Sequence, residues 1–256
     1  MRIVIFTSNS IRHKFFANSI SKRVEESLIV SECSQNDSIE LEESKIINHF
    51  KKRFETEQKY FGNNDYFLGN VIPIMYKEVN MDYIYKIIMK FQPDCMIVFG
   101  SSIIKEPLLS IKTKGFINLH LGISPYYRGS GTNFWPFVND ELQYVGSTIL
   151  YLDPGIDSGD IITHVRPKFE IDDDVHTVGC KVIKESVKTI LKIIEKIRND
   201  EPIKSVKQWK VRNERYYKNK DFDLSALEKY QKNLENGIIK KYMINEKDEI
   251  KLIYLD

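Results

Sequence analysis

A doubly wound α/β sheet is the fold class that this sequence predicts, and three observations support it. A short β-branched run at residues 2–6 stops at the polar segment 7–10, and a helix-like stretch begins near Arg12. A strand, a small polar turn and a helix entry in this order are typical of such sheets. Residues 95–99 are apolar without alternation, as expected of a central parallel strand covered by helices on both faces. Asp174 precedes a long amphipathic pattern and is suited to cap that helix.

The N-terminal half alternates strand and helix signals. An apolar run at residues 27–30 predicts the second strand. Residues 39–61 are charged, but their apolar side chains recur at roughly helical spacing, which predicts a long helix that ends at the turn cluster 62–65. Residues 71–74 predict a third strand. An apolar helical stripe then spans residues 83–91, and a Pro-Asp pair ends it before the central strand.

The rest of the chain continues this alternation and then changes texture. Residues 116–119, 147–152 and 161–165 predict strands, and the helix capped by Asp174 carries an apolar stripe as far as Ile197. Past Lys207, lysine and asparagine become frequent. We predict a short helix over residues 224–234 and two strands over 238–255. The fold class is therefore a Rossmann-like, mostly parallel sheet with helices on both faces over residues 1–205, plus a small C-terminal module of a short helix and a β-hairpin over 206–256.

Composition excludes several classes of protein. A hydrophobic content of 42% in 256 residues suits a folded domain rather than a disordered chain. The 38 basic and 36 acidic residues nearly cancel, which gives no global case for nucleic-acid binding. The sequence has no apolar run long enough to span a bilayer, and its start lacks the features of a secretory signal. Three scattered cysteines without a CxxC pair predict neither a disulfide framework nor a zinc site, so a cytoplasmic location is expected.

Polar residues with a potential chemical role follow two of the predicted strands. Asn118 and His120 are two apart at a strand end, so their side chains project from the same side. Asp157 lies in a second loop that contains two glycines. An amide donor, an imidazole and a carboxylate suit acyl transfer, since they can stabilise an oxyanion, move a proton and orient the imidazole. Taken singly, His120 is more often a structural histidine and Asp157 a turn residue, so spacing alone leaves both interpretations open.

The stretch from residue 93 to residue 162 resembles the 10-formyltetrahydrofolate-dependent formyltransferases. That family's pattern is Asn-x-His, a Ser-x-x-Pro loop, Arg-Gly and later Asp-x-Gly-x-Asp-x-Gly. Here it reads Asn118-Leu119-His120, Ser124-Pro125, Arg128-Gly129 and Asp153-Pro154-Gly155-Ile156-Asp157-Ser158-Gly159. The combination is specific although its parts are not. The chain departs from the family in the loop after His120, where the family often has Ser-Leu-Leu-Pro and this chain has Leu121-Gly122-Ile123-Ser124-Pro125.

The resemblance implies 10-formyltetrahydrofolate as the co-substrate and no metal. Asn118, His120 and Asp157 are then the catalytic residues, and direct attack by a substrate amine is the simpler mechanism because no GxSxG elbow or suitable cysteine supplies a nucleophile. The pterin is expected between two backbone segments, which contribute Ile103, Lys105, Asp153, Gly155 and Ile156.

Three acceptor amines compete under this resemblance. Phosphoribosylglycinamide enzymes usually have a Gly-rich loop after the first strand, whereas this chain has Ser8, Asn9, Ser10 and Arg12. These residues are equally compatible with binding a diphosphate and with an ordinary capped, solvated helix start. Methionyl-tRNA enzymes share the Arg-Gly and Asn-Phe-Trp segments but usually carry a larger C-terminal barrel. The N-formyltransferases of nucleotide-linked amino sugars fit best. Their likeness adds Tyr126, Tyr127 and Arg128 as sugar or diphosphate contacts.

The function predicted from the sequence is formylation of a nucleotide-linked dideoxy-amino-hexose for surface polysaccharides such as the lipopolysaccharide O-antigen. The expected partner is a nucleotide-diphosphate amino sugar, with no nucleic acid and no membrane. A helical face with His49 and Arg53 is compatible with nucleotide binding, although a solvated face is the more common case. A homodimer through the 238–255 hairpin and a hairpin that covers its own core are both compatible with the sequence. A non-catalytic module that binds folate or a nucleotide is the rival from another class.

Overall fold

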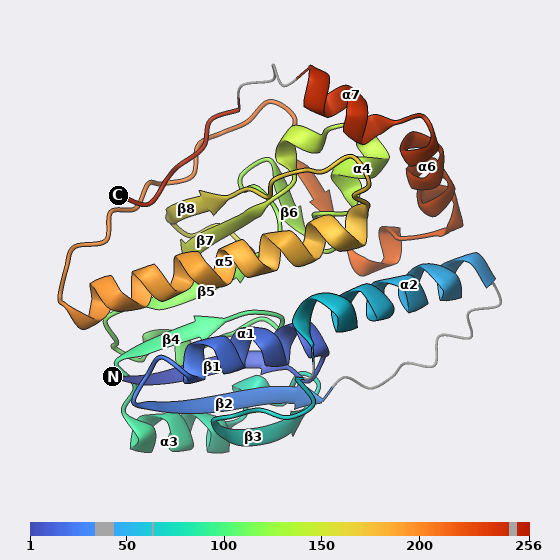
Figure 1. Cartoon of the computed structure of the whole chain (residues 1–256). Coiled ribbons are helices and arrows are strands. Elements are labelled where there is room, and N and C mark those ends of the chain that lie inside the picture. The colour runs from blue at the N-terminus through green and yellow to red at the C-terminus, as the bar shows by residue number, and fades with distance from the viewer. Residues whose placement is uncertain (34–43, 63, 246–249) are drawn as a thin grey trace.

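The computed structural model describes residues 1–33, 44–62, 64–245 and 250–256, and its centre is a mixed β-sheet (Figure 1). Within these ranges the sheet has seven strands in the order β3-β2-β1-β4-β5-β7-β8. The first five are parallel, whereas β7 and β8 run antiparallel to their neighbours. The strands are β1 (Arg2–Ser8), β2 (Glu26–Cys33), β3 (Asn70–Met75), β4 (Cys95–Val98), β5 (Phe116–His120), β7 (Ser147–Tyr151) and β8 (Ile161–Val165). The predicted Rossmann-like, mostly parallel sheet is confirmed.

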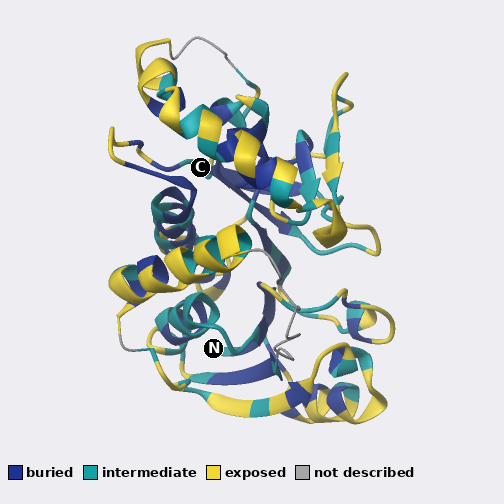
Figure 2. Cartoon of the chain, turned by 90° about the vertical axis from the view of Figure 1, so that its right-hand side faces the viewer, coloured by how far each residue is buried: buried dark blue, intermediate teal, exposed yellow. Residues whose placement is uncertain are grey.

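Strand β1 shows why the sheet is covered on both faces. Ile3, Val4, Ile5 and Phe6 are all fully buried. Since side chains alternate along a strand, Ile3 and Ile5 enter one hydrophobic cluster and Val4 and Phe6 enter another. Figure 2 shows the same pattern for the whole molecule, with buried strands between helices that are partly exposed.

Helices occupy both faces of the sheet, as predicted. On one face lie α1 (Ile11–Ser21) and α5 (Val175–Arg198), with α2 (Ser44–Phe61) packed against both. Helix α3 (Asp82–Phe91) covers the other face. Helix α2 begins at Ser44, and residues 39–43 of the predicted helix lie outside the described residues. Among the helices that the structure describes, none is both long and apolar enough to cross a bilayer.

Asp174 caps α5, as the sequence indicates. Its carboxylate accepts from the backbone N–H groups of His176 and Thr177, both at 2.9 Å, and the Thr177 hydroxyl accepts from the Asp174 N–H at 2.9 Å. This reciprocal pair satisfies backbone donors that the first turn of the helix leaves without partners. The cap therefore determines where α5 begins.

The predicted β-hairpin over residues 238–255 is wrong. Residues Ile238–Ile244 form a helix, α7, and the described residues after it form no strand. Gly237, with φ of +71°, ends the preceding helix α6 (Leu224–Glu235) and starts α7. Ile238 and Ile239 are buried, and Tyr242 packs beside them at helical spacing. A dimer edge built from such a hairpin therefore has no strand here to pair.

Short elements link the sheet to the C-terminal segment. Strand β6 (Tyr127–Gly129) pairs in parallel with β9 (Arg215–Tyr217), and the Trp135 and Tyr217 rings stack at a centroid distance of 4.0 Å. The remaining short helices are α4 (Trp135–Asn139), η1 (Glu78–Asn80), η2 (Leu108–Ser110), η3 (Leu142–Tyr144) and η4 (Asn219–Asp221). Helices α4, α6 and α7 share one hydrophobic cluster with the start of α5.

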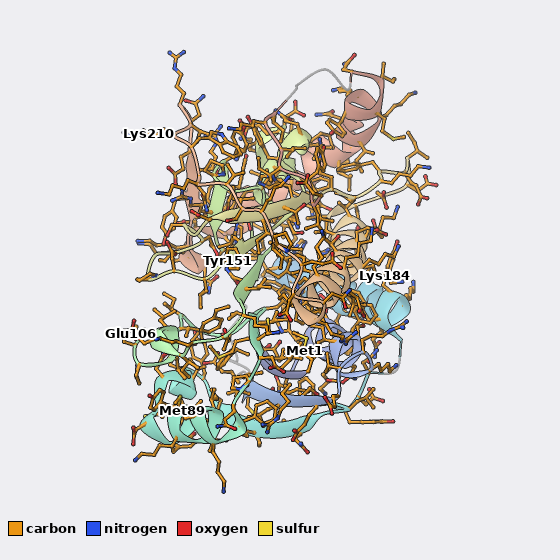
Figure 3. All side chains as sticks on the ribbon, turned by 90° about the vertical axis from the view of Figure 1, so that its left-hand side faces the viewer. Met1, Met89, Glu106, Tyr151, Lys184 and Lys210 are labelled. Carbon is orange, nitrogen blue, oxygen red and sulfur yellow. The ribbon has the colours of Figure 1, made fainter. Side chains whose placement is uncertain are left out.

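The C-terminal segment also covers the β8 edge of the sheet. Val206 forms an isolated bridge with Ile161, and the Ile253 carbonyl accepts from the His164 N–H at 2.7 Å. In Figure 3, Met89 of α3 and Lys210 of this segment lie toward opposite ends of the molecule, with Tyr151 of β7 between them. The division at residues 205 and 206 stays a prediction, but residues on both sides of it share packing.

Candidate active site

The site lies at the carboxyl end of strand β5, where Asn118 and His120 are close to the strand's end. Strand β5 runs parallel to β4 and antiparallel to β7, so its carboxyl end lies beside that of β4. Open α/β sheets bind ligands in the crevice beyond these carboxyl ends. Asp157 comes from the loop of residues 152–160 between β7 and β8. Antiparallel pairing places the end of β7 opposite the start of β5, since Tyr151 pairs with Ile117, and the loop then extends back along β5, where Asp157 contacts Asn118 and His120.

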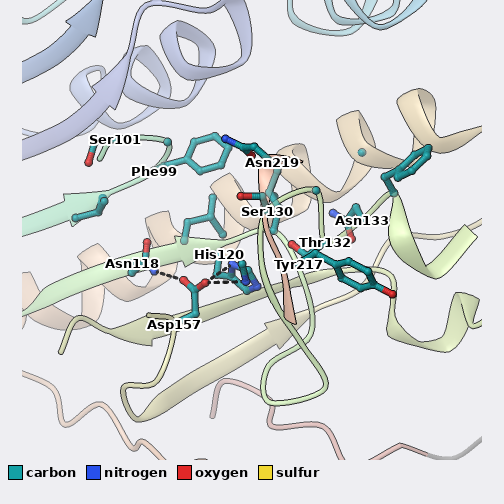
Figure 4. A pocket seen from close by; sticks show the side chains of 18 of the residues that line it. Phe99, Ser101, Asn118, His120, Ser130, Thr132, Asn133, Asp157, Tyr217 and Asn219 are labelled. Atoms are coloured by element: carbon teal, nitrogen blue, oxygen red, sulfur yellow. Dashed lines mark hydrogen bonds and ion pairs between the residues drawn. The ribbon is translucent and has the colours of Figure 1, made fainter. Parts of the chain in front are cut away.

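One carboxylate joins the three side chains (Figure 4). Asn118 Nδ2 donates to Asp157 Oδ1 at 3.0 Å, and His120 Nδ1 lies 3.2 Å from Asp157 Oδ2. The Gly129 N–H also points at Oδ2, at 3.4 Å. Asp157 has φ of +51°, a left-handed conformation that is unusual for a residue with a side chain. The three side chains predicted from sequence therefore converge.

The backbone holds the His120 ring from its other side. Nε2 lies 3.0 Å from the carbonyl oxygen of Tyr127, so each ring nitrogen faces an oxygen. Gly122 passes close to this ring, since a Cβ at that position would lie 2.7 Å from His120 Nε2 and 2.7 Å from Thr132 Cβ. Glycine is therefore required in the loop where this chain departs from the family pattern, and it lets the loop fold tightly over the imidazole.

Asn118, His120 and Asp157, here called the triad, line a cavity of about 650 Å³. Its size is in the range of pockets that hold small ligands. Two further parts of its lining, here called walls, differ in their chemistry. One wall consists of the segment after β4 and the Asp157 loop, and the other consists of α2, the starts of α1 and α5, and residues 216–219. Gly100, with φ of +76°, belongs to the first wall, and the His13 ring at the start of α1 occupies the space that a Cβ there would need.

The first wall holds most of the residues predicted to bind the pterin. Ile103, Asp153, Gly155 and Ile156 line the cavity, but Lys105 does not. Two backbone groups expected to face the pterin bind Asn80 of η1 instead: the Ile103 carbonyl accepts from Nδ2 at 2.8 Å, and the Lys105 N–H donates to Oδ1 at 2.7 Å. No sequence signal pointed to Asn80.

This wall fits a flat, partly polar ring system. Ile103 is 54% exposed and Ile156 is 42% exposed, so both present apolar surface beside the triad. The Ser102 hydroxyl is buried in the same wall and has no hydrogen-bond partner in the described structure. A heteroaromatic ligand in this part of the cavity would cover the two isoleucines.

The second wall carries positive charge. Arg12 Nη2 contacts Glu57 Oε1 at 2.9 Å, and Arg53 Nε lies 3.8 Å from the same oxygen. Two guanidinium groups thus share one carboxylate, while Arg12 Nε is buried without a hydrogen-bond partner among the described residues. Burial and the nearby Arg12 charge lower the pKa of Arg53 to about 10, which leaves it protonated at neutral pH. Lys218 lines the same wall.

Three histidines complete the second wall as neutral side chains. Burial, with the charges of Arg12 and Arg53, holds the pKa of His13 well below its ordinary value. Burial also lowers the pKa of His49 to about 4 and that of His176 to about 3. The two imidazole rings lie 4.5 Å apart between centroids, next to Phe134. The positive charge of this wall therefore comes from arginine and lysine rather than from histidine.

The loop after β1 does not present its predicted groups to the cavity. The Ser8 and Ser10 hydroxyls both contact His13 Nδ1, the latter at 2.9 Å, so they hold that ring. Asn9 lies between them and, like both serines, does not line the cavity. Among the four residues predicted from this loop, Arg12 alone is a lining residue.

Tyr127 does not occupy the predicted substrate-facing position. Its side chain has no exposed surface, and its hydroxyl donates to Glu141. Because its carbonyl instead contacts His120, it acts from behind the site. Tyr126 packs on Tyr144 and Trp209, and Arg128 forms an ion pair with Glu214 at 3.2 Å. None of these three predicted residues lines the cavity.

The cavity wall offers neither a thiolate nor a group of metal ligands among the described residues. Cys180 lines the cavity, but burial raises the pKa of its thiol to about 12. Cys95 is buried with a pKa that is also raised to about 12. No set of three or more His, Cys, Asp or Glu side chains in the described ranges is arranged to hold a metal ion.

Known proteins are similar to this chain in sequence. The family described as formyl transferase matches residues 1–194. The chain belongs to this family. Its curated relatives include a methionyl-tRNA formyltransferase from Desulforamulus reducens, 28% identical over 131 residues, which are 50% of this chain and 41% of the relative. This chain therefore spans about two fifths of that relative's length.

Solved formyl transferase structures match the fold over most of their length. A 4-N formyltransferase from Francisella tularensis has a TM-score of 0.56 at 21% identity, covering 87% of this chain and 81% of the other. The formyltransferase PseJ from Anoxybacillus kamchatkensis, solved with UDP-4,6-dideoxy-4-formamido-L-AltNAc and tetrahydrofolate, has a TM-score of 0.52 at 21% identity and covers 86% and 87%. These similarities establish the fold.

Proposed function

We propose that this chain transfers a formyl group from 10-formyltetrahydrofolate to the amine of a nucleotide-linked amino sugar. One cavity holds both the Asn118–His120–Asp157 constellation and the Arg12–Arg53 wall, and the proposal rests on this shared cavity. The first can act on a carbonyl, and the second suits a phosphorylated substrate. The formamido sugar would serve surface polysaccharides such as the O-antigen, and the reaction would take place in the cytoplasm.

The residues divide the chemistry between them. 10-Formyltetrahydrofolate supplies an electrophilic formyl carbon. Asn118 uses one N–H on Asp157, which leaves its other N–H for an oxygen that gains negative charge. With the Nδ1 proton held by Asp157, unprotonated His120 Nε2 would turn from the Tyr127 carbonyl, accept the proton of the attacking amine and pass it to N10 as the bond between N10 and the formyl carbon breaks and tetrahydrofolate leaves. Asp157 orients the imidazole through Nδ1. Ile103, Asp153, Gly155 and Ile156 are the proposed pterin contacts.

The charge of the second wall favours a diphosphate. Arg12, Arg53 and Lys218 against one Glu57 leave an excess of positive charge opposite the triad. A nucleotide-diphosphate sugar carries two phosphate charges between its base and its sugar, so the phosphates can face this wall while the sugar amine faces the triad. Phe134, His49 and His176 provide flat, uncharged surface beyond it.

A direct assay tests the proposal. Purified protein is incubated with 10-formyltetrahydrofolate and with dTDP-, UDP- or GDP-linked sugars that bear the amine on C3 or C4, and tetrahydrofolate release and the formamido sugar are measured. We expect turnover with one of these sugars. Thermal-shift screening with the nucleotide diphosphates identifies the base, because binding to the native state raises stability.

Methionyl-tRNA formylation is the second candidate, favoured by the curated relatives. The same assay therefore includes charged initiator tRNA and phosphoribosylglycinamide as acceptors. Turnover with either of these and with none of the amino sugars would refute the proposed substrate class. Saturable folate or nucleotide binding without tetrahydrofolate release from any acceptor would instead indicate a binding module.

The Arg53→Gln variant tests the cationic wall against Lys59→Gln on the same helix. Both variants lose one positive charge, but Lys59 is exposed and does not line the cavity. We expect Arg53→Gln to raise KM for the nucleotide sugar roughly tenfold or more, since charged hydrogen bonds are lost. KM should stay near the wild-type value in Lys59→Gln. Equal KM values in both variants would contradict a role for Arg53 in binding the phosphates of the substrate.

A further inference from the structure

Gln208, in the segment between α5 and β9, contacts the backbone of the catalytic loop. Its Nε2 donates to the Asp157 carbonyl at 2.7 Å and to the Gly159 carbonyl at 2.9 Å. These two carbonyls lie on either side of Ser158. The carboxamide of Gln208 therefore holds a single turn of the loop. The side chain is half-buried, and the residue is 51 positions from Asp157 in the chain.

The other end of the same carboxamide reaches a second segment of the site. Gln208 Oε1 accepts from Arg128 Nη2 at 3.0 Å. Arg128 precedes Gly129, whose N–H points at Asp157 Oδ2. Glu214 holds the Arg128 guanidinium at 3.2 Å. Gln208 thus ties the loop that carries the catalytic carboxylate to the strand that faces this carboxylate.

The loop needs such support at Asp157. A non-glycine residue in the left-handed region is strained and persists only where its surroundings hold it. Asp153 supports the loop on both sides of Asp157, because its Oδ1 accepts from the Gly155 N–H at 3.1 Å and from the Ser158 hydroxyl at 2.9 Å. The backbone carbonyls of Asp157 and Gly159 are held by Gln208.

From these contacts we propose that Gln208 is a positioning residue, which holds Asp157 in the conformation that places its carboxylate between Asn118 and His120. The role rests on the proposed formyl transfer for its kinetic consequence but not for its structural one. Gln208 does not line the cavity, so its effect passes through Asp157. Misplacement of a catalytic group by about 1 Å can reduce turnover roughly a hundredfold.

Two substitutions distinguish the hydrogen bonds that Gln208 makes to the loop from simple packing of its side chain. Gln208→Glu keeps the shape and an acceptor for Arg128, but it replaces the two N–H donors with an oxygen that faces two carbonyls. Gln208→Ala removes the whole carboxamide. The matched control is Asn233→Ala, because Asn233 Nδ2 donates in the same way to the Phe137 and Val138 carbonyls, at 2.8 and 3.1 Å, in another part of the structure.

Steady-state kinetics and local hydrogen exchange give the two readouts. We expect both Gln208 variants to lower kcat about tenfold to a hundredfold, with KM for the nucleotide sugar little changed. Amide exchange at residues 153–160 should rise in both variants, while exchange in the sheet stays as in the wild type. Asn233→Ala should alter neither kcat nor exchange in that loop.

The outcomes are distinct. Unchanged kcat and loop exchange in both Gln208 variants would overturn the proposal. So would exchange that rises throughout the chain, because Gln208 would then support the whole fold rather than the loop. If the wild type formylates no amino sugar, the proposed function fails, but loop exchange in the variants still decides whether Gln208 holds Asp157.

Discussion

Asn118 and Asp157 are 39 positions apart in the chain, and a hydrogen bond of 3.0 Å joins Asn118 Nδ2 to Asp157 Oδ1. The same carboxylate contacts His120 through its other oxygen. A single acidic group thereby fixes the orientation of both an amide donor and an imidazole. Substitutions that keep the size of these side chains and change only charge are therefore the most informative.

Asp157→Asn tests the carboxylate without changing its size. The amide cannot accept at both oxygens, so it loses either the Asn118 contact or the His120 contact. We expect kcat to fall about a hundredfold or more, while folate binding is retained. Asp160→Asn in the same loop is the control, because Asp160 does not line the cavity. Similar kcat values for the two variants would contradict a role for Asp157.

Asn118→Asp and Asn118→Ala should differ in their pH dependence. Both variants lose the amide donor, and we expect kcat to fall by roughly two powers of ten in each. The Asp variant also sets two carboxylates side by side at neutral pH, and their repulsion should lower Tm. Acidification protonates one of them and should restore Tm toward that of the Ala variant. Thermal melts of both variants at pH 7.5 and pH 5 measure this. If the Tm difference between the Asp and Ala variants is the same at both pH values, residues 118 and 157 do not interact.

Two glycine substitutions should have opposite effects on stability. In Gly122→Ala the new Cβ would meet His120 Nε2 and Thr132 Cβ at 2.7 Å, so we expect a loss of about 1–3 kcal/mol and a lower kcat. Gly179 lies inside α5 with no atom within 4 Å of an added Cβ. Gly179→Ala should stabilise the protein by about 0.5–1 kcal/mol through helix propensity. Urea unfolding measures both free energies.

Acid should destabilise the protein through its buried histidines. The pKa of His176 is lowered to about 3 and that of His49 to about 4, from an ordinary value of 6.5, chiefly by burial. Between pH 6.5 and these values the unfolded chain binds protons that the native state does not, so stability falls as pH falls through this window. His176→Gln removes one such group, and its Tm should drop less between pH 7.5 and pH 5 than the wild-type Tm does. An equal drop would mean that His176 is not held neutral.

Local patterns were sufficient to predict the strands of the central sheet and the helices that cover it. The β-branched run at residues 2–6 and the apolar run at 95–99 predicted β1 and β4, because a strand buried on both faces needs apolar side chains at every position. Asp174 predicted the start of α5, since capping is a contact between residues three apart. The 238–255 hairpin failed because Ile238, Ile239 and Tyr242 fit a buried helix once α6 is beside them, and no local signal shows that neighbour.

The candidate site was predictable only in part. The Asn-x-His and Asp-x-Gly motifs led to three side chains that do converge, and Ile103, Asp153, Gly155 and Ile156 do line the cavity. Tyr127 was misplaced because the alternation along β6 turns its side chain into the core. Asn80 was missed because a lone polar residue in a short helix carries no motif, although it binds the backbone of Ile103, which lines the cavity, and that of Lys105 beside it.

The sequence by itself determined the succession of sheet strands and main helices as far as α5, the cap on α5 and the identity of the three converging side chains, because each depends on residues that are near neighbours or form a motif. Only the tertiary structure decided that Arg12 and Arg53 share Glu57, that Tyr127 is buried and that Gln208 holds Asp157. Those contacts join segments far apart in the chain, and they arise when packing of the helices and the C-terminal segment brings these segments together.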